Sequence, residues 1–260
     1  MNDGWRLVLS FVVGGVWVAA ATAVAERRGT RLGGFIGGLP STLAVALLFM
    51  ALTGGREAAA EAGAVGPLAF GVNALFVLMF VSLSRLGFYP AMGIALAAWA
   101  FLQASIVRLG GVSLGGAVGG WAVCFGACYW GFERVLKIGS RPAGGPKAGL
   151  LGLGLRAVAS GLLVVAAVAA SLRWGGVAGG VLASLPVIFV SALFIAYRSM
   201  GMGFAQSLAR SIVFSAVINC SAFALFFHFA VRVWPALPAF AAAYALTLLL
   251  AIPVYRLKLG

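Results

Sequence analysis

Prolines and polar side chains interrupt the long apolar runs of this sequence at two matching places. Pro40 is followed by Ser41 and Thr42, and a second Leu-Pro pair ends at Pro186. A proline removes one helix hydrogen bond and clashes with the preceding turn, so it kinks the helix and frees a carbonyl that can face a cavity. We therefore expect Pro40, Ser41, Thr42 and Pro186 to bind a substrate. The alternative is that these prolines only shape helix packing, since proline is frequent in transmembrane helices.

Two asparagines and one histidine also lie within apolar runs. Asn73 and Asn219 carry amides that need hydrogen-bond partners in apolar surroundings, and either a substrate or a neighbouring helix can supply them. We include both in the expected binding site. His228 is the only histidine, and its titration near neutral pH suits a proton relay, with packing at the membrane interface as the alternative. Other polar aromatic and amide residues either line a pore or belong to aromatic belts: Tyr89, Trp99, Gln103, Tyr129, Trp130, Tyr197 and Tyr244.

Acidic residues are placed where ion pairs form at the membrane surface. Glu26 stands next to two arginines and Glu133 next to one, each at the end of an apolar run. A carboxylate at mid-depth is not expected, which argues against proton-coupled export of cations and favours a neutral or anionic substrate. The sequence carries no GxSxG, HExxH or GxxxxGK motif, so we expect no enzyme activity and no cofactor. The cysteines, Cys124, Cys128 and Cys220, are expected to pack as reduced thiols without a metal.

The composition is that of a membrane protein. Of 260 residues, 63% are hydrophobic and 9% are charged, whereas soluble domains carry about 25% charged residues. The net charge of +13 does not indicate nucleic-acid binding, because the lysines and arginines stand between apolar runs of about 20 residues. The sequence therefore predicts an all-α integral membrane protein.

About nine transmembrane helices are expected, and basic residues orient them. Thirteen lysines and arginines fall on one side of these spans and five on the other. The positive-inside rule then places the N-terminus outside and the C-terminus inside, in a multi-pass protein of the cytoplasmic (inner) membrane. The spans are expected at 7–25, 33–53, 65–84, 88–107, 111–132, 152–171, 175–197, 210–231 and 237–255.

The chain divides into two related halves. A first repeat of five helices (1–132) and a second of four (151–260) flank a Gly-, Pro- and Lys/Arg-rich cytoplasmic linker (133–150). Residues 33–49 and 179–195 align at an offset of 146, the distance from Pro40 to Pro186, with six identical pairs in seventeen. The same offset pairs Asn73 with Asn219. Five spans separate the first span from its counterpart, and an odd number reverses direction across the membrane, so the repeats are expected to be inverted.

The first half resembles a known group of membrane proteins. GGFIGGLPSTLAVALLF (33–49) followed by GPLAFGVNALFVLMF (66–80) is similar to the small four-helix GlpM-like proteins of the drug/metabolite transporter superfamily, and GGVLASLPVIFVSALFI (179–195) looks like a second copy. The resemblance implies inverted repeats and transport but names no cargo. The superfamily commonly has five helices per repeat, so this chain departs from it by lacking a tenth helix.

Taken together, these features predict a secondary transporter or flippase that moves a small or lipid-linked metabolite by alternating access at the repeat interface. The alternative is a non-transporting scaffold or accessory subunit that packs against partner membrane proteins through glycine-rich faces. The expected partners are membrane lipids and the substrate, with a homodimer as a further alternative. Gly33, Gly34, Gly179 and Gly180 are expected at close helix contacts.

Overall fold

A computed structural model describes residues 3–27, 38–110, 112–139 and 150–257, and in these ranges the chain forms helices and no strand. Apolar side chains without helix-breaking runs produce the long segments, and glycine, proline and charged residues separate them. The helices are α1 (Asp3–Arg27), α3 (Ser41–Thr53), α4 (Arg56–Ser82), η1 (Ser84–Leu86), α5 (Phe88–Arg108), α6 (Leu114–Trp130), η2 (Gly131–Leu136), α7 (Leu150–Trp174), α8 (Gly176–Ala183), α9 (Val187–Met200), α10 (Met202–Ile212), η3 (Val213–Val217), α11 (Ile218–Val233) and α12 (Ala236–Leu257).

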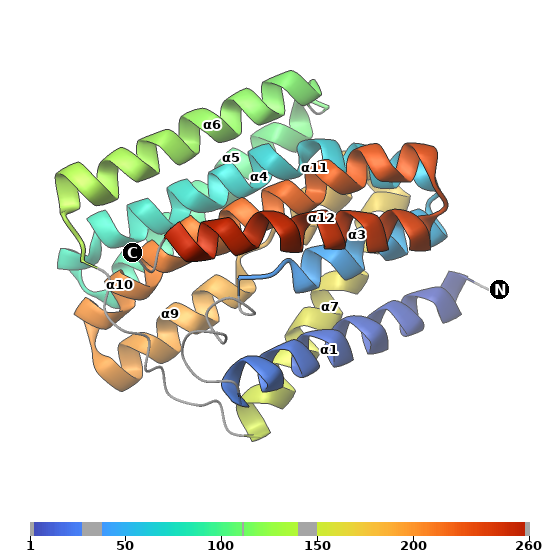
Figure 1. Ribbon diagram of the computed structural model, residues 1–260. Coiled ribbons are helices and arrows are strands. Elements are labelled where there is room, and N and C mark those ends of the chain that lie inside the picture. The colour runs from blue at the N-terminus through green and yellow to red at the C-terminus, as the bar shows by residue number, and fades with distance from the viewer. Residues whose placement is uncertain (1–2, 28–37, 111, 140–149, 258–260) are drawn as a thin grey trace.

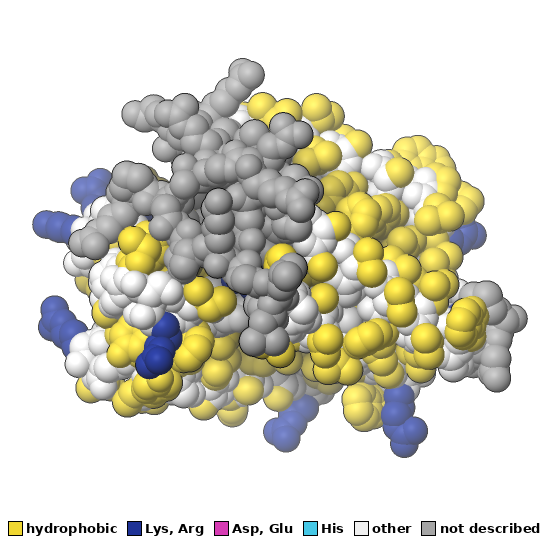
Figure 2. All heavy atoms as spheres, turned by 90° about the horizontal axis from the view of Figure 1, so that it is seen from below, with side chains coloured by type: hydrophobic (Ala, Val, Ile, Leu, Met, Phe, Trp, Pro, Cys, Tyr) yellow, Lys and Arg dark blue, Asp and Glu magenta, His cyan; other side chains and the backbone are white. Residues whose placement is uncertain are grey.

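Six helical stretches within the described ranges are long and apolar enough to cross a membrane. They are Arg56–Ser82, Phe88–Arg108, Leu153–Trp174, Gly176–Met200, Met202–Val233 and Ala236–Pro253. Hydrophobic side chains cover much of the visible face in Figure 2, and the lysine and arginine side chains project mostly from its edges. The all-α prediction is confirmed, and the structure is that expected for a multi-pass membrane protein. The count of nine spans and the inverted repeats stay predictions.

Helix α4 lies at the centre of the bundle, in contact with α11, α6, α8 and α5. Figure 1 shows α1 and α7 side by side at one edge and α6 at the opposite edge. Glycines allow the central helices to approach closely: a Cβ on Gly66 would lie 2.3 Å from the Cβ of Ala224 in α11, and one on Gly180 would lie 2.6 Å from the carbonyl oxygen of Ala62. The core therefore depends on backbone-to-backbone packing, as in many membrane bundles.

The predicted close contact at the second glycine pair is present. A Cβ on Gly179 would lie 2.6 Å from the Cβ of Ser171 in α7, so both Gly179 and Gly180 stand where a larger side chain does not fit. The matching pair, Gly33 and Gly34, lies outside the described residues.

Two segments differ in extent from their predictions. The predicted linker 133–150 begins inside a helix, because α6 continues through the π-helical turn η2 as far as Leu136. The span predicted at 210–231 is part of a longer helical stretch, Met202–Val233, which η3 interrupts as a second π-helical turn. The charged residues at these two places, Glu133 in η2 and Arg210 in α10, form an ion pair with one another.

Candidate functional site

The residues 38–40, which we call the first break, lead into α3 through a tight turn. Pro40 has φ −77° and ψ 57°, and the amide of Ser41 donates to the carbonyl of Leu39 at 2.8 Å. This is the geometry of an inverse γ-turn. Helix α3 then begins at Ser41, and its first backbone bond runs from Ala44 to the carbonyl of Pro40 at 2.9 Å.

The residues 184–186, which we call the second break, separate α8 from α9 in the same way. Pro186 has φ −80° and ψ 38°, the amide of Val187 donates to the carbonyl of Leu185 at 2.8 Å, and the amide of Val190 donates to the carbonyl of Pro186 at 2.8 Å. Each of these residues lies 146 positions after its equivalent in the first break. The two Leu-Pro pairs thus adopt one local structure.

Each proline lies directly before the first residue of a helix, α3 or α9. A kink within a continuous helix was expected, and at Pro186 the helix is instead interrupted between α8 and α9. The residues before 38 that would show the same at Pro40 lie outside the described ranges. Proline fixes φ and donates no backbone hydrogen bond, which suits it to the start of a helix as well as to a kink. The break leaves carbonyls of residues 38 and 184 available to side chains.

The two asparagines bond to these carbonyls reciprocally. Asn73 in α4 donates from Nδ2 to the carbonyl of Ser184 at 2.7 Å, and Asn219 in α11 donates from Nδ2 to the carbonyl of Gly38 at 3.1 Å. Both asparagines are buried. Each half of the chain therefore contributes an amide that holds the break in the other half, and the two bonds are related by the same offset of 146 residues.

Two residues of α5 extend the polar cluster at the second break. Trp99 donates from Nε1 to Oδ1 of Asn73 at 2.6 Å. Gln103 donates from Nε2 to the carbonyl of Ala69 at 3.0 Å and to Oγ of Ser184 at 3.2 Å. The sequence offered Trp99 and Gln103 only as pore or belt residues. Their separation of four places them on one helix face, but the sequence does not reveal their partners, Asn73 for Trp99 and Ser184 for Gln103.

The first break has fewer partners within the described residues. The Oδ1 atom of Asn219 and the hydroxyl of Thr42 are buried without a hydrogen bond, although a buried polar atom normally finds one. Gly38, the equivalent of Ser184, has no side chain to bond. Ser41 is partly exposed. Buried polar atoms without a hydrogen bond therefore lie near both breaks: Asn219 Oδ1 and Thr42 Oγ1 at the first, and Gln103 Oε1 at the second.

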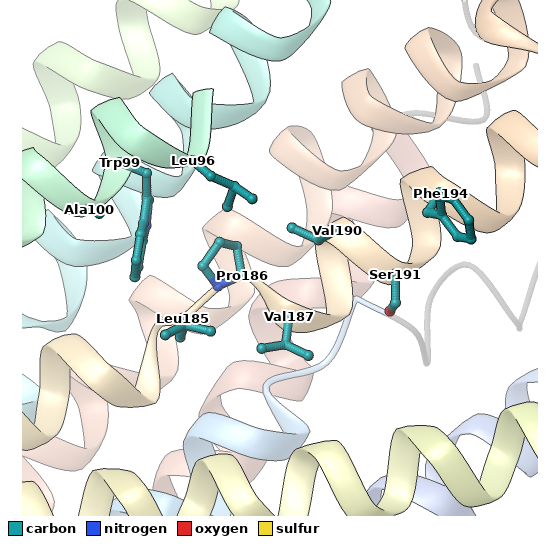
Figure 3. Close-up of a pocket in the computed structure, with 9 residues that line it drawn as sticks. All are labelled: Leu96, Trp99, Ala100, Leu185, Pro186, Val187, Val190, Ser191 and Phe194. Carbon is teal, nitrogen blue, oxygen red and sulfur yellow. The ribbon is translucent and has the colours of Figure 1, made fainter. Parts of the chain in front are cut away.

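A groove of about 550 Å³ opens beside the second break (Figure 3). Leu96, Trp99 and Ala100 of α5 line one side, and Pro186, Val190 and Phe194 line the other. Pro186 is the one predicted binding residue that lines this groove. Asn73 lies behind Trp99, to which it is bonded, and Asn219 reaches the opposite break. Within the described residues, the predicted binding residues therefore lie at two related places, and a cavity shared by all of them stays a prediction.

His228 contacts the backbone of α4. Its Nδ1 lies 2.6 Å from the carbonyl oxygen of Ala60, and because a carbonyl only accepts, Nδ1 carries the proton. The side chain is buried, and a Cβ on Gly63 of α4 would lie 3.1 Å from the Cβ of His228. This contact matches the packing alternative, and the proton-relay role stays a prediction.

The remaining candidate residues are the acidic residues Glu133 and Glu26 and the three cysteines. Glu133 pairs with Arg210, which donates from Nε at 3.0 Å and also from Nη2, so its partner is on α10 and is not the neighbouring Arg134. The side chain of Glu26 lies outside the described residues. Across the described ranges, no group of three or more His, Cys, Asp or Glu side chains could hold a metal ion. Cys124, Cys128 and Cys220 are free thiols.

No protein-family model, curated protein or solved structure matches this chain. The resemblance to GlpM-like proteins accordingly rests on the quoted residues, and it stays a prediction.

Proposed function

We propose that the chain is a secondary transporter or flippase, which moves a small or lipid-linked, neutral or anionic metabolite by alternating access between two inverted repeats. The proposal takes all nine helical segments as spans, five in the first repeat and four in the second. Helix starts support this pairing: α7, α9, α10 and α12 begin 146 to 148 residues after α1, α3, α4 and α5 respectively. Helix α6 is then the fifth span of the first repeat.

Contacts between α1 and α7 support an inverted relation. A Cβ on Gly161 would lie 2.8 Å from the carbonyl oxygen of Phe11, and one on Gly15 would lie 3.0 Å from that of Ala157. The pairing of 11 with 161 and of 15 with 157 requires antiparallel helices. Because 157 and 161 are the equivalents of 11 and 15 at the 146 offset, these contacts are also related by a two-fold exchange of the halves.

Matching turns support the same relation. Gly55 before α4 and Gly201 before α10 both have positive φ, 92° and 80°, a conformation that glycine adopts without steric cost. They too are 146 residues apart. The two halves thus begin their equivalent helices with the same backbone turn.

The observation that carries the proposal is the reciprocal bonding of Asn73 to Ser184 and of Asn219 to Gly38. Discontinuous helices at a repeat interface, with free backbone carbonyls and polar side chains, form the binding sites of many transporters. Here a hydrogen bond from an asparagine joins each discontinuity to the other repeat. A change at one break therefore alters the environment of the other half, which is the coupling that alternating access requires.

The scaffold alternative has one observation in its favour. Asn73 uses both its donor and its acceptor within the protein, as a packing residue would. The unpaired atoms at Asn219 and Thr42 favour a ligand site instead, so we retain transport as the primary proposal. The proposed orientation keeps the N-terminus outside and the C-terminus in the cytoplasm of a cytoplasmic (inner) membrane.

Access to the first break tests the proposal without knowledge of the cargo. In a background with all three cysteines changed to alanine, Ser41→Cys and Thr42→Cys are expected to react with a membrane-impermeant thiol reagent. The reagent should reach them from each side of the membrane in turn. The matched control is Leu47→Cys, at a fully buried position of the same helix, which should remain unreactive. Unreactive cysteines at 41 and 42 in folded protein would support the scaffold.

A second assay asks directly for movement of lipid. The purified protein is placed in liposomes that contain a fluorescent phospholipid, and a membrane-impermeant reductant then bleaches the outer leaflet. A flippase exposes the inner pool, so the remaining fluorescence falls toward zero, whereas a transporter of a water-soluble metabolite leaves about half.

A further inference from the structure

The groove beside the second break has the surface of a hydrocarbon site. The indole N–H of Trp99 already donates to Asn73. The one hydroxyl in the lining belongs to Ser191, and it donates to the carbonyl of Ile188 in its own helix at 3.0 Å. The remaining lining is aliphatic or aromatic (Figure 3). A polar cargo would find no free hydrogen-bonding group there, whereas an alkyl chain needs none.

The position of the groove suits a lipid tail. Trp99 lies near the middle of α5 (Phe88–Arg108), so the deep end of the groove is near mid-membrane when that helix spans the bilayer. Phe194, one of the lining residues, has an exposed hydrophobic side chain. The groove therefore faces the hydrocarbon of the membrane.

One end of the groove continues into an aromatic cluster. Phe194 packs against Phe88 with ring centroids 5.9 Å apart, and Phe88 stacks on Tyr197 at 4.5 Å. Tyr89 meets Tyr197 edge to face at 6.5 Å. Tyrosines of this kind belong at the boundary between hydrocarbon and head groups, so this cluster marks the mouth of the groove.

Positive charge lies at the same mouth. Arg198 follows Phe194 by four residues and so extends the groove-lining face of α9, while Arg85 stands in η1 just before α5; both are exposed. Among the described acidic residues, Glu133 is held by Arg210, and Glu57 and Glu61 lie in the first turns of α4. The mouth therefore complements an anion.

The length of the groove matches one leaflet. Eleven residues separate Val187 at the deep end from Arg198, which corresponds to about 16 Å of helix at 1.5 Å per residue. Half of the ~30 Å hydrocarbon core is about 15 Å. A single acyl chain lying from Trp99 to Phe194 would thus place its phosphate level with Arg198.

We propose that the groove between α5 and α9 binds an acyl chain of an acidic phospholipid, with the phosphate at Arg198 and Arg85. The proposed orientation makes this a lipid of the cytoplasmic leaflet, where anionic lipids attract basic residues. This lipid class is the substrate class for the proposed function. The binding of the lipid does not depend on that function, whereas its transport does.

Lipid retention tests the binding itself. The protein is purified in detergent with equal amounts of phosphatidylglycerol and phosphatidylcholine, washed, and analysed for retained lipid by mass spectrometry. We expect an excess of phosphatidylglycerol that falls about fivefold for each of Arg85→Gln and Arg198→Gln, the effect of one basic residue near an anionic lipid. Arg108→Gln, at the opposite end of α5, is the charge control and should leave the ratio unchanged.

Filling the groove supplies the second arm. Val190→Trp should reduce both retained lipids, while Ile94→Trp, on the exposed face of α5, should reduce neither. Equal retention of the two lipids by the unmodified protein, or equal losses in the two tryptophan variants, would overturn the proposal. If Val190→Trp does not fold, the surface arginine variants still decide it.

The two proposals fail separately. Selective retention without movement of fluorescent lipid would make the groove a fixed lipid site and would count against the flippase. Movement of lipid at an unchanged rate in Val190→Trp and in the arginine variants, without selective retention, would refute the groove proposal and leave transport standing.

Discussion

Asn73 and Ser184 are 111 residues apart, and a hydrogen bond of 2.7 Å joins them across the interior of the bundle. The mirror of this bond, from Asn219 to Gly38, spans 181 residues. Helix packing alone needs neither bond to be repeated. Both bonds run from a helix of one half to the backbone of a break in the other, so the breaks and the asparagines form one structural unit.

The two asparagines are expected to differ in their contribution to stability. Asn73→Ala leaves Trp99 Nε1 and the Ser184 carbonyl unpaired, whereas Asn219→Ala loses the one hydrogen bond to Gly38 and removes an acceptor that was already unpaired. At about 1–2 kcal/mol per buried bond, Asn73→Ala should lower the thermal unfolding midpoint in detergent roughly twice as much. Ser105→Ala, which removes only a bond within its own helix, is the control. An equal or larger drop for Asn219→Ala would contradict this asymmetry.

Gln103 and Asn73 should be energetically coupled, because both bond to Ser184. A double-mutant cycle with Asn73→Ala and Gln103→Leu is expected to give an interaction energy of about 0.5–2 kcal/mol. The reference cycle combines Gln103→Leu with Thr247→Val, whose hydroxyl bonds to Ala243 in α12, and should be additive. Unfolding free energies of the four variants in each cycle provide the measurement, and additivity in the first cycle would argue against a connected cluster.

Gly180 should not tolerate a side chain. Its Cβ would lie 2.6 Å from the Ala62 carbonyl and 2.7 Å from Val65 Cγ1, whereas a Cβ on Gly93 meets nothing within 4 Å. We expect Gly180→Leu to reduce the yield of monodisperse protein several-fold and Gly93→Leu to leave it unchanged. Size-exclusion chromatography in detergent measures both, and similar yields would place the Gly180 face toward lipid.

The ion pair between Glu133 and Arg210 should contribute modestly and depend on salt. Both side chains are partly exposed, with 33% and 24% of their surface accessible, and such pairs contribute about 0–1 kcal/mol. Glu133→Arg should lower the unfolding midpoint, and adding Arg210→Glu should restore most of it by reversing the pair. Failure of the reversed pair to recover stability would show that the site's packing, including Arg210 over the Phe214 ring, matters more than its charges.

The topology is expected to place the two termini on opposite sides of the membrane. Thirteen basic residues lie on the proposed cytoplasmic side and five outside, so a reporter active only in the cytoplasm should report from the C-terminus and not from the N-terminus. Signals from both ends would mean that the number of spans is even. The predicted topology and the inverted repeat would then both be wrong.

The sequence predicted the elements better than their interruptions. Apolar run length located the long helices because bilayer thickness sets that length. It did not predict that Pro40 and Pro186 would each end a turn and start a helix, since one proline is compatible with a kink or a break. The ion-pair partner of Glu133 is Arg210, which is distant in sequence, and no local pattern contains that information.

The sequence predicted which residues belong to the candidate site, but it did not predict how they are arranged. The 146-residue offset identified Asn73 and Asn219 as a pair, but the partner of each depends on which segments of the folded chain meet. Trp99 and Gln103 were ambiguous because an indole or an amide in an apolar run suits a belt, a pore or a buried bond. Ser184 carried no signal, because serine is common in transmembrane helices.

The exchange of hydrogen bonds between the halves also bears on how the protein is made. During translation at about 5–20 residues per second, the 111 residues between Asn73 and Ser184 take roughly 6 to 22 s. Through this interval the amide of Asn73 has no Ser184 carbonyl to bond, and the carbonyl of Gly38 lacks Asn219 for a longer interval, because 181 residues separate them. The first half must therefore remain an incomplete folding intermediate until the second half is synthesised. If the two halves were made as separate chains, each would contain a break without its asparagine hydrogen bond.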